Sequence, residues 1–124
     1  MNSKVLMVLR ILLSLPYIVF GLNFFFHFIP MPPMSGDSAA FMGIFFGSGW
    51  MTFIKVLEVV CGLALVSNQY SRLAAIAILP VTINILLFHS LVAGNPGMGI
   101  AMLLLNISVL YGYKDDFKGA FKRN

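Results

Sequence analysis

Cysteine is nearly absent from this chain of 124 residues, which contains Cys61 as its single cysteine. One thiol cannot form an intramolecular disulfide, a CxxC dithiol relay or a thiolate metal cluster. Charged residues are also scarce, at 10% of the sequence, whereas a soluble domain carries about a quarter. The few basic residues form no run interleaved with aromatic residues, so no nucleic-acid partner is expected. These scarcities exclude dithiol chemistry and disfavour a soluble domain.

Apolar residues, by contrast, make up 60% of the sequence and gather in four runs. A membrane-spanning helix needs about 20 apolar residues, so we expect the two shorter runs to cross the bilayer nearly upright. The sequence therefore predicts an all-α membrane protein, a four-transmembrane-helix bundle in one domain over residues 1–124, with a basic tail over 114–124. The predicted spans are residues 5–29, 50–66, 73–93 and 97–113.

The placement of Lys and Arg predicts the orientation of these spans. Both residue types are absent from 30–49 and from the turn at 93–97. Lys4 precedes the first run, Arg72 lies between the second and third, and the tail is rich in lysine. Because cytoplasmic loops carry the excess of basic residues, both termini are predicted to be cytoplasmic.

The loop between the first two spans is longer than a helical hairpin needs. Asp37 or Ser38 can cap a helix start, Phe41 and Phe45 form an i,i+4 pair, and Gly47 can end the helix. We predict a short amphipathic helix at the outer membrane interface. Two interpretations follow: an apolar tether packed on the bundle, or a lid over a pocket.

Strongly polar residues within the spans fall in the outer half of the predicted membrane, apart from Arg10, which lies within reach of the inner interface. At a rise of about 1.5 Å per residue, Glu58 lies roughly 12 Å below Trp50, and Asn84 and Asn106 lie about 13 Å deep. Lys55 and two histidines lie nearer the outer surface. The predicted ligand-binding residues are Glu58, His27, His89, Lys55, Asn23, Asn84 and Asn106.

These residue types suit a polar pocket. A lone glutamate in hydrocarbon would take up a proton, but Lys55 one helical turn from Glu58 offers opposite charge. A carboxylate flanked by imidazoles can relay protons, hold a cationic or quinone-like ligand, or bind a divalent metal. No metal site is assigned, and no catalytic residue is named.

Each of these residues also has a structural interpretation. The three asparagines can form interhelical hydrogen bonds. Lys55 can extend to the outer interface without a partner. His27 and His89 can contact headgroups or backbone carbonyls at helix ends. Glu58 is the hardest to explain structurally, because an ionisable residue inside a membrane is costly and usually functional.

Three stretches carry a family resemblance: "FGLNFFFHFIPMPP" from Phe20, "KVLEVVCGLALVSNQYSRLA" from Lys55 and "LPVTINILLFH" from Leu79. Across nearly its full length the chain resembles DoxX-like membrane proteins. The resemblance implies a four-helix bundle in the cytoplasmic (inner) membrane of a bacterium. Family members include a thiosulfate:quinone oxidoreductase subunit, a protein needed for methylamine dehydrogenase maturation and chaperone-like eukaryotic branches, so the family has no single activity.

Within this family resemblance, two classes of function remain open. The protein is either a redox-linked subunit that binds a quinone or similar small lipophilic ligand, or an accessory protein that recognises a partner's transmembrane helix. A small exporter is a weaker third interpretation. Haem held by His27 and His89 is conceivable but disfavoured, and a homo-oligomer stays open, as does enzymatic activity. The lipid bilayer is the one partner that the composition itself requires.

Overall fold

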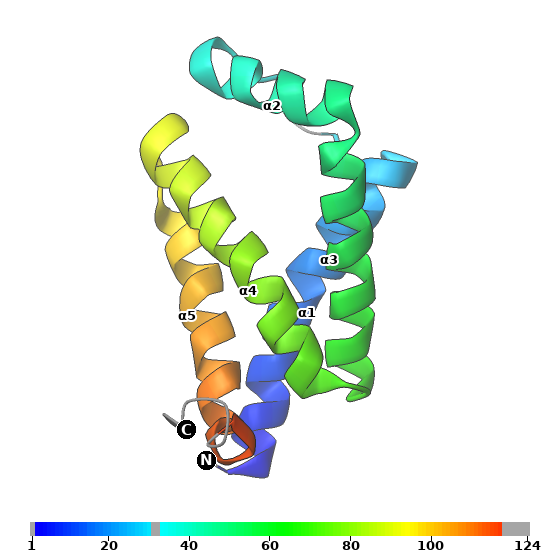
Figure 1. Ribbon diagram of the computed structural model, residues 1–124, viewed down its shortest axis with the longest axis vertical. Coiled ribbons are helices and arrows are strands. Elements are labelled where there is room, and N and C mark those ends of the chain that lie inside the picture. Colours follow the sequence, from blue (N-terminus) through cyan, green and yellow to red (C-terminus); the bar gives the residue numbers. More distant parts are fainter. Residues whose placement is uncertain (1, 31–32, 118–124) are drawn as a thin grey trace, which may run out of the picture.

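A computed structural model describes residues 2–30 and 33–117, and the secondary structure of these residues is entirely helical. Figure 1 shows the order of the helices along the chain. The structure has five α-helices, a π-helical turn, η1, that continues α4, and a 3₁₀ turn, η2, that follows α5. The elements are α1 (Ser3–Phe26), α2 (Gly36–Ser48), α3 (Trp50–Ser67), α4 (Ser71–Leu87), η1 (Phe88–Val92), α5 (Gly97–Gly112) and η2 (Lys114–Phe117).

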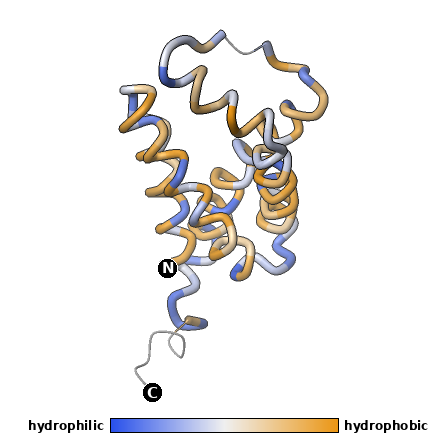
Figure 2. Tube along the Cα trace, turned by 45° about the horizontal axis from the view of Figure 1, so that its top comes forward, coloured by the Kyte–Doolittle hydropathy of each residue, from blue (hydrophilic) through white to orange (hydrophobic). Residues whose placement is uncertain are grey.

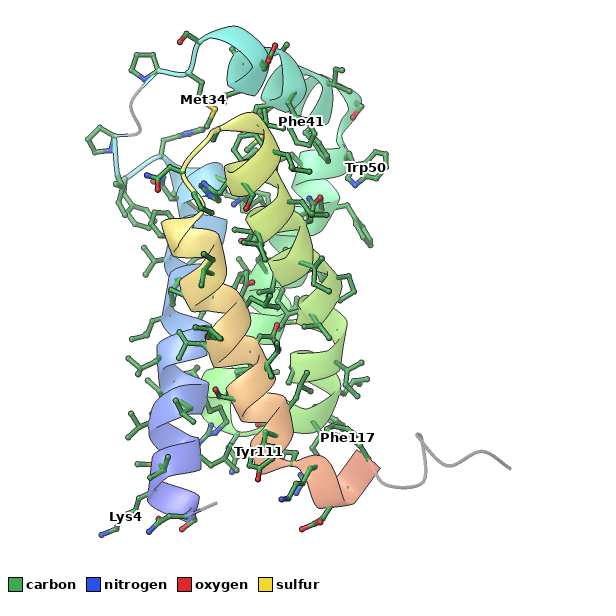
Figure 3. All side chains as sticks on the ribbon, turned by 90° about the vertical axis from the view of Figure 1, so that its left-hand side faces the viewer. Lys4, Met34, Phe41, Trp50, Tyr111 and Phe117 are labelled. Atoms are coloured by element: carbon green, nitrogen blue, oxygen red, sulfur yellow. The ribbon has the colours of Figure 1, made fainter. Side chains whose placement is uncertain are left out.

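Four long helices form an up-and-down ring. Helix α1 packs on α3 and α4 packs on α5, and contacts from α3 to α4 and from α1 to α5 close the ring. Helix α2 lies across one end of this bundle (Figure 1). Met34, Phe41 and Trp50 lie at that end, which we call the α2 end, whereas Lys4 and Phe117 lie at the opposite, η2 end (Figure 3).

The lengths and apolar composition of the helices match a membrane protein. Helices α1 and α3 and the continuous segment Ser71–Val92 are each long and apolar enough to cross a membrane, and α5 is a shorter apolar helix. Apolar residues extend over most of the bundle (Figure 2), and Val60, Leu73 and Leu104 are exposed on its outside. In water such a surface would be unfavourable, but in lipid it is the expected one. The prediction of an all-α membrane bundle is confirmed.

The end of α1 differs from the predicted limit at residue 29. The helix stops at Phe26 because His27 adopts a left-handed conformation with a φ of 52°. The side chain of Asn23 accepts a hydrogen bond of 2.7 Å from the backbone N–H of Ile29. The helix therefore ends through its own polar C-terminal turn, before the prolines that follow.

Helix α2 is longer than the predicted helix. Its N-cap is Ser35, instead of the predicted Asp37 or Ser38. The helix continues through Gly47 to Ser48, and its C-cap is Gly49, whose φ is 81°. The left-handed conformation that terminates a helix suits glycine at position 49. None of its residues is buried, and Ile44 is 72% exposed.

The helices approach one another most closely at glycines. A Cβ atom added to Gly62 of α3 would lie 2.6 Å from Cγ1 of Ile18 on α1. One added to Gly99 of α5 would lie 2.6 Å from Cα of Leu86 on α4. Glycine at these positions allows the backbones to pack closely, which matters in a membrane because lipid gives helices no hydrophobic driving force to associate.

The η2 end is held together by exposed interactions. Arg72 Nε lies 2.7 Å from Asp116 Oδ2, and the Arg72 guanidinium lies 4.7 Å from the centre of the Tyr113 ring. Of the predicted basic tail over 114–124, the structure describes residues up to Phe117, and Lys118, Lys122 and Arg123 lie outside the described residues. The assignment of residues 1–124 to one domain with this tail stays a prediction.

Candidate functional site

The bundle contains a half-open cavity of about 260 Å³ near its α2 end. All four long helices contribute to its walls, and α2 lies over it. Aromatic and thioether side chains dominate the lining, which suits a lipophilic ligand because methionine is flexible and polarisable. These apolar residues include Phe20, Phe41, Phe45, Phe88, Met34, Met42, Met51, Met98 and Met102.

A lysine and a glutamate from α3 form an ion pair in this apolar wall. Lys55 Nζ lies 3.2 Å from Oε2 of Glu58 and 3.4 Å from Oε1. The spacing of three residues places the two side chains on one face of the helix. The Glu58 side chain is 5% exposed and the Lys55 side chain 20%. The carboxylate is therefore the deeper member of the pair, and the ammonium lies nearer the rim.

Two further polar side chains reach the cavity from the third span. Asn84 belongs to α4 and His89 to the π-helical turn η1. In that turn the N–H of Ala93 donates to the carbonyl of Phe88 over 2.9 Å, which is the wide i to i+5 pattern. An inserted residue of this kind rotates the side chains that follow it, and such turns are frequent at functional sites. Asn84 is exposed at the rim, whereas His89 is half-buried.

Below the ion pair, a buried hydrogen-bond chain links three helices. Tyr17 of α1, whose ring lines the cavity, pairs its hydroxyl with the hydroxyl of Thr82 on α4. Thr82 Oγ1 donates to Oδ1 of Asn106 on α5 over 2.8 Å, and Nδ2 of Asn106 donates to the carbonyl of Ala75 over 3.1 Å. This chain fixes the helices that form the floor of the cavity.

The structure brings together four of the seven predicted ligand-binding residues. Lys55, Glu58, Asn84 and His89 line one cavity. Asn106 lies in the hydrogen-bond chain beneath it, so its amide connects α5 to α4 in the way expected of an interhelical asparagine.

Asn23 and His27 lie outside the cavity lining, at the C-terminal end of α1. The Asn23 side chain accepts the Ile29 N–H, and His27 is an exposed helix cap. His89 therefore lines the cavity, whereas His27 does not.

Metal-ligating side chains do not gather elsewhere in the described residues. Among residues 2–30 and 33–117, no group of three or more His, Cys, Asp or Glu side chains is close enough to hold a metal ion. Cys61 is a buried free thiol one helical turn below Glu58.

Sequence reasoning did not identify the cavity-lining methionines or Tyr17 and Thr82. Tyr17 and Thr82 are nearly fully buried. Because both side chains are only weakly polar, their presence in an apolar span gives no clear signal in the sequence. The methionines give a weak signal, because Met51, Met98 and Met102 all lie in the outer part of their predicted spans.

Comparison with known proteins supports a family assignment. The DoxX family model matches residues 5–90, which is more than half of the 124 residues and includes α1, α2, α3 and α4. No curated protein and no solved structure gives a significant match to the chain. The matched region contains the ion pair and both polar residues contributed by the third span. The chain belongs to the DoxX family.

Proposed function

We propose that this DoxX-family protein is a redox-linked membrane subunit that holds a quinone, or a similar small lipophilic ring compound, in the cavity at its α2 end. The observation that carries this proposal is one buried ion pair, Lys55–Glu58, in a wall of phenylalanine and methionine side chains. An ionisable pair inside a membrane is costly, and it is usually retained for function.

The size of the cavity sets the size of the ligand. Ligand pockets commonly span about 300–1,000 Å³, and this cavity of about 260 Å³ lies just below that range. A space of this volume suits one substituted ring. The isoprenoid tail of a membrane quinone would then lie outside it, along the apolar helices.

The ion pair matches the hydrogen-bonding groups of a quinone in both redox states. Lys55 can donate to a carbonyl oxygen of the oxidised ring, and Glu58 can accept from a hydroxyl group of the reduced ring. Phe20, Phe41 and Phe88 can pack on the ring, and the thioethers can adapt to its substituents. His89 and Asn84 add further polar contacts from the opposite wall.

We assign the α2 end to the outer side of a bacterial cytoplasmic membrane. Lys4 and Arg72, together with Lys114, support this orientation because they belong to the η2 end, and basic residues favour the cytoplasmic side. With both termini cytoplasmic, the cavity lies in the outer half of the membrane.

The fluorescence of Trp50 provides the test. It is the single tryptophan of the chain, and its ring centre lies 5.5 Å from that of Phe45, which lines the cavity. In detergent-solubilised protein, a short-chain ubiquinone should quench Trp50 saturably. Glu58→Gln should weaken this binding at least about tenfold, because Lys55 loses the carboxylate that holds its ammonium in the cavity wall. The helical circular dichroism should be unchanged, because the substitution keeps the shape of the side chain.

The matched control is Asp37→Asn, which makes the same carboxylate-to-amide change at an exposed position of α2 outside the cavity. It should bind the ubiquinone like the unmodified chain. Equal affinity in Glu58→Gln would contradict the role of the ion pair. Absence of saturable quenching, with a membrane protein co-purifying and no quinone in the lipid extract, would instead favour the accessory role in assembling a partner.

A further inference from the structure

Helix α2 covers the cavity, yet it is attached to the bundle through surface contacts. It supplies Phe41, Met42 and Phe45 to the cavity lining, and none of its thirteen residues is buried. The described hydrogen bonds of its side chains are local, from Ser48 Oγ to the Phe45 carbonyl and from the Trp50 N–H to Ser48 Oγ. No described side-chain hydrogen bond therefore ties the roof to the opposite wall.

Ring contacts hold α2 in place. Phe41 lies 5.2 Å from Phe88 of η1, measured between ring centres, and Phe46 stacks on Phe24 of α1 at 5.5 Å. Ring contacts carry little directional constraint, in contrast to the hydrogen-bond chain below the cavity, so they can separate and form again without leaving a polar group unpaired.

Both ends of α2 carry glycine in a left-handed conformation. Gly36 has a φ of 60° and Gly49 a φ of 81°, and a Cβ atom added at either position would meet nothing within 4 Å. Close packing therefore does not require glycine there, and the backbone conformation does. Two such positions, one on each side of a rigid helix, are suited to absorb the φ and ψ changes of a hinge.

We propose that α2 is a lid, and that it swings about Gly36 and Gly49 to open the cavity to the aqueous phase at the α2 end. When α2 lifts, Phe41, Met42 and Phe45 leave the cavity, and the ion pair of α3 becomes accessible to water. The ring of a ligand can then enter past α2 at the end of the bundle, while an isoprenoid tail stays in the lipid. This inference concerns access alone and does not depend on the identity of the ligand.

A reversible metal clamp tests the lid without a ligand. Phe24→His and Phe46→His replace two stacked rings that lie outside the cavity lining, so Zn²⁺ can bridge them while α2 is closed. Met102→Cys, in a Cys61→Ser background, places a thiol in the cavity wall, where Met102 is 4% exposed. The protein is placed in lipid nanodiscs, and the reagent is a charged methanethiosulfonate that does not cross lipid.

We expect the thiol to react readily without zinc, at least tenfold more slowly with zinc, and readily again after EDTA. The same protein with Phe24 and Phe46 intact should react at one rate with and without zinc, which controls for zinc binding to the thiol. A thiol that stays unreactive without zinc would show that α2 does not open. Rapid labelling in the zinc-bound form would place the route elsewhere, and failure of zinc to bind the histidine pair would contradict the closed position of α2.

Discussion

The two halves of the bundle differ in how they treat polar groups. Below the cavity, in the part of the bundle that we call the η2 half, Arg10 donates to the carbonyls of Leu65 and Val66, and Thr82 and Asn106 belong to a buried hydrogen-bond chain. In the part around the cavity, which we call the α2 half, Lys55 and Glu58 pair with each other on α3 and line the cavity wall. One half uses polar groups to join helices, and the other has them in a cavity wall, where we propose that a ligand binds. Changes in the η2 half should therefore reduce stability, and changes in the α2 half should reduce binding.

The largest effect on stability is expected where two helices touch backbone to backbone. Gly62→Ala should lower the free energy of unfolding by about 1–3 kcal/mol, because the new methyl group must displace Ile18. Unfolding in mixed detergent micelles measures it. Gly43→Ala in α2 is the matched control, since a Cβ there meets nothing within 4 Å, and it should be neutral or stabilising. A neutral Gly62→Ala would show that the η2 half is not tightly packed.

A smaller loss is expected from the buried amide of the η2 half. Asn106→Leu removes one of the partners of Thr82 and the bond to the Ala75 carbonyl, and it should cost about 1–2 kcal/mol. Asn84→Leu is the same substitution at the exposed rim of the cavity, and it should leave the unfolding free energy nearly unchanged. Equal losses of unfolding free energy in the two variants would show that polar residues contribute equally to stability in both halves.

The ion pair of the α2 half should matter little to folding. Replacing both residues, Lys55→Met with Glu58→Leu, should leave stability unchanged or raised, because a desolvated ion pair often returns less than its desolvation costs. Quenching of Trp50 by the short-chain ubiquinone should be lost in the same protein. A marked loss of stability would make the pair part of the framework of the bundle, like Asn106.

The smallest effect is expected at the surface of the η2 end. Asp116→Asn breaks the contact of Asp116 with Arg72, in which both side chains are about half exposed. Exposed ion pairs contribute little to stability, so the unfolding curve should superimpose on that of the unmodified chain at physiological salt. A clear shift of the unfolding curve would show that the contact of Asp116 with Arg72 contributes to the stability of the bundle.

The depth of polar residues could be predicted from the sequence, but their direction around each helix could not. The spacing of Lys55 and Glu58 placed them one turn apart, and the structure shows them as an ion pair. Asn106 has nearly the same predicted depth as Glu58, yet its amide bonds to α4. Depth follows from counting residues along a helix, whereas direction depends on how the helices rotate against one another.

Helix ends show a second limit of the sequence. The first apolar run predicted an end at residue 29 for α1, but Asn23 and His27 close the helix earlier through a local cap. The apolar runs still located every long helix of the described chain, because length and hydrophobicity depend on the bilayer and not on neighbouring helices. The cavity could not be predicted, since it arises where packing between helices is incomplete.

The contact of Arg10 with the end of α3 has a consequence for how the chain is made. A guanidinium in α1 is synthesised 55 residues before the carbonyl of Leu65 that accepts its hydrogen bond. During that interval the charge has no partner from α3, so we expect α1 to insert less stably before α3 is made. Helices α1 and α3 should then enter the bilayer together, and α1 should remain beside the insertion machinery until α3 leaves the ribosome. In truncated nascent chains, photo-cross-links from α1 to that machinery should persist until Leu65 has emerged, and Arg10→Leu should release α1 early.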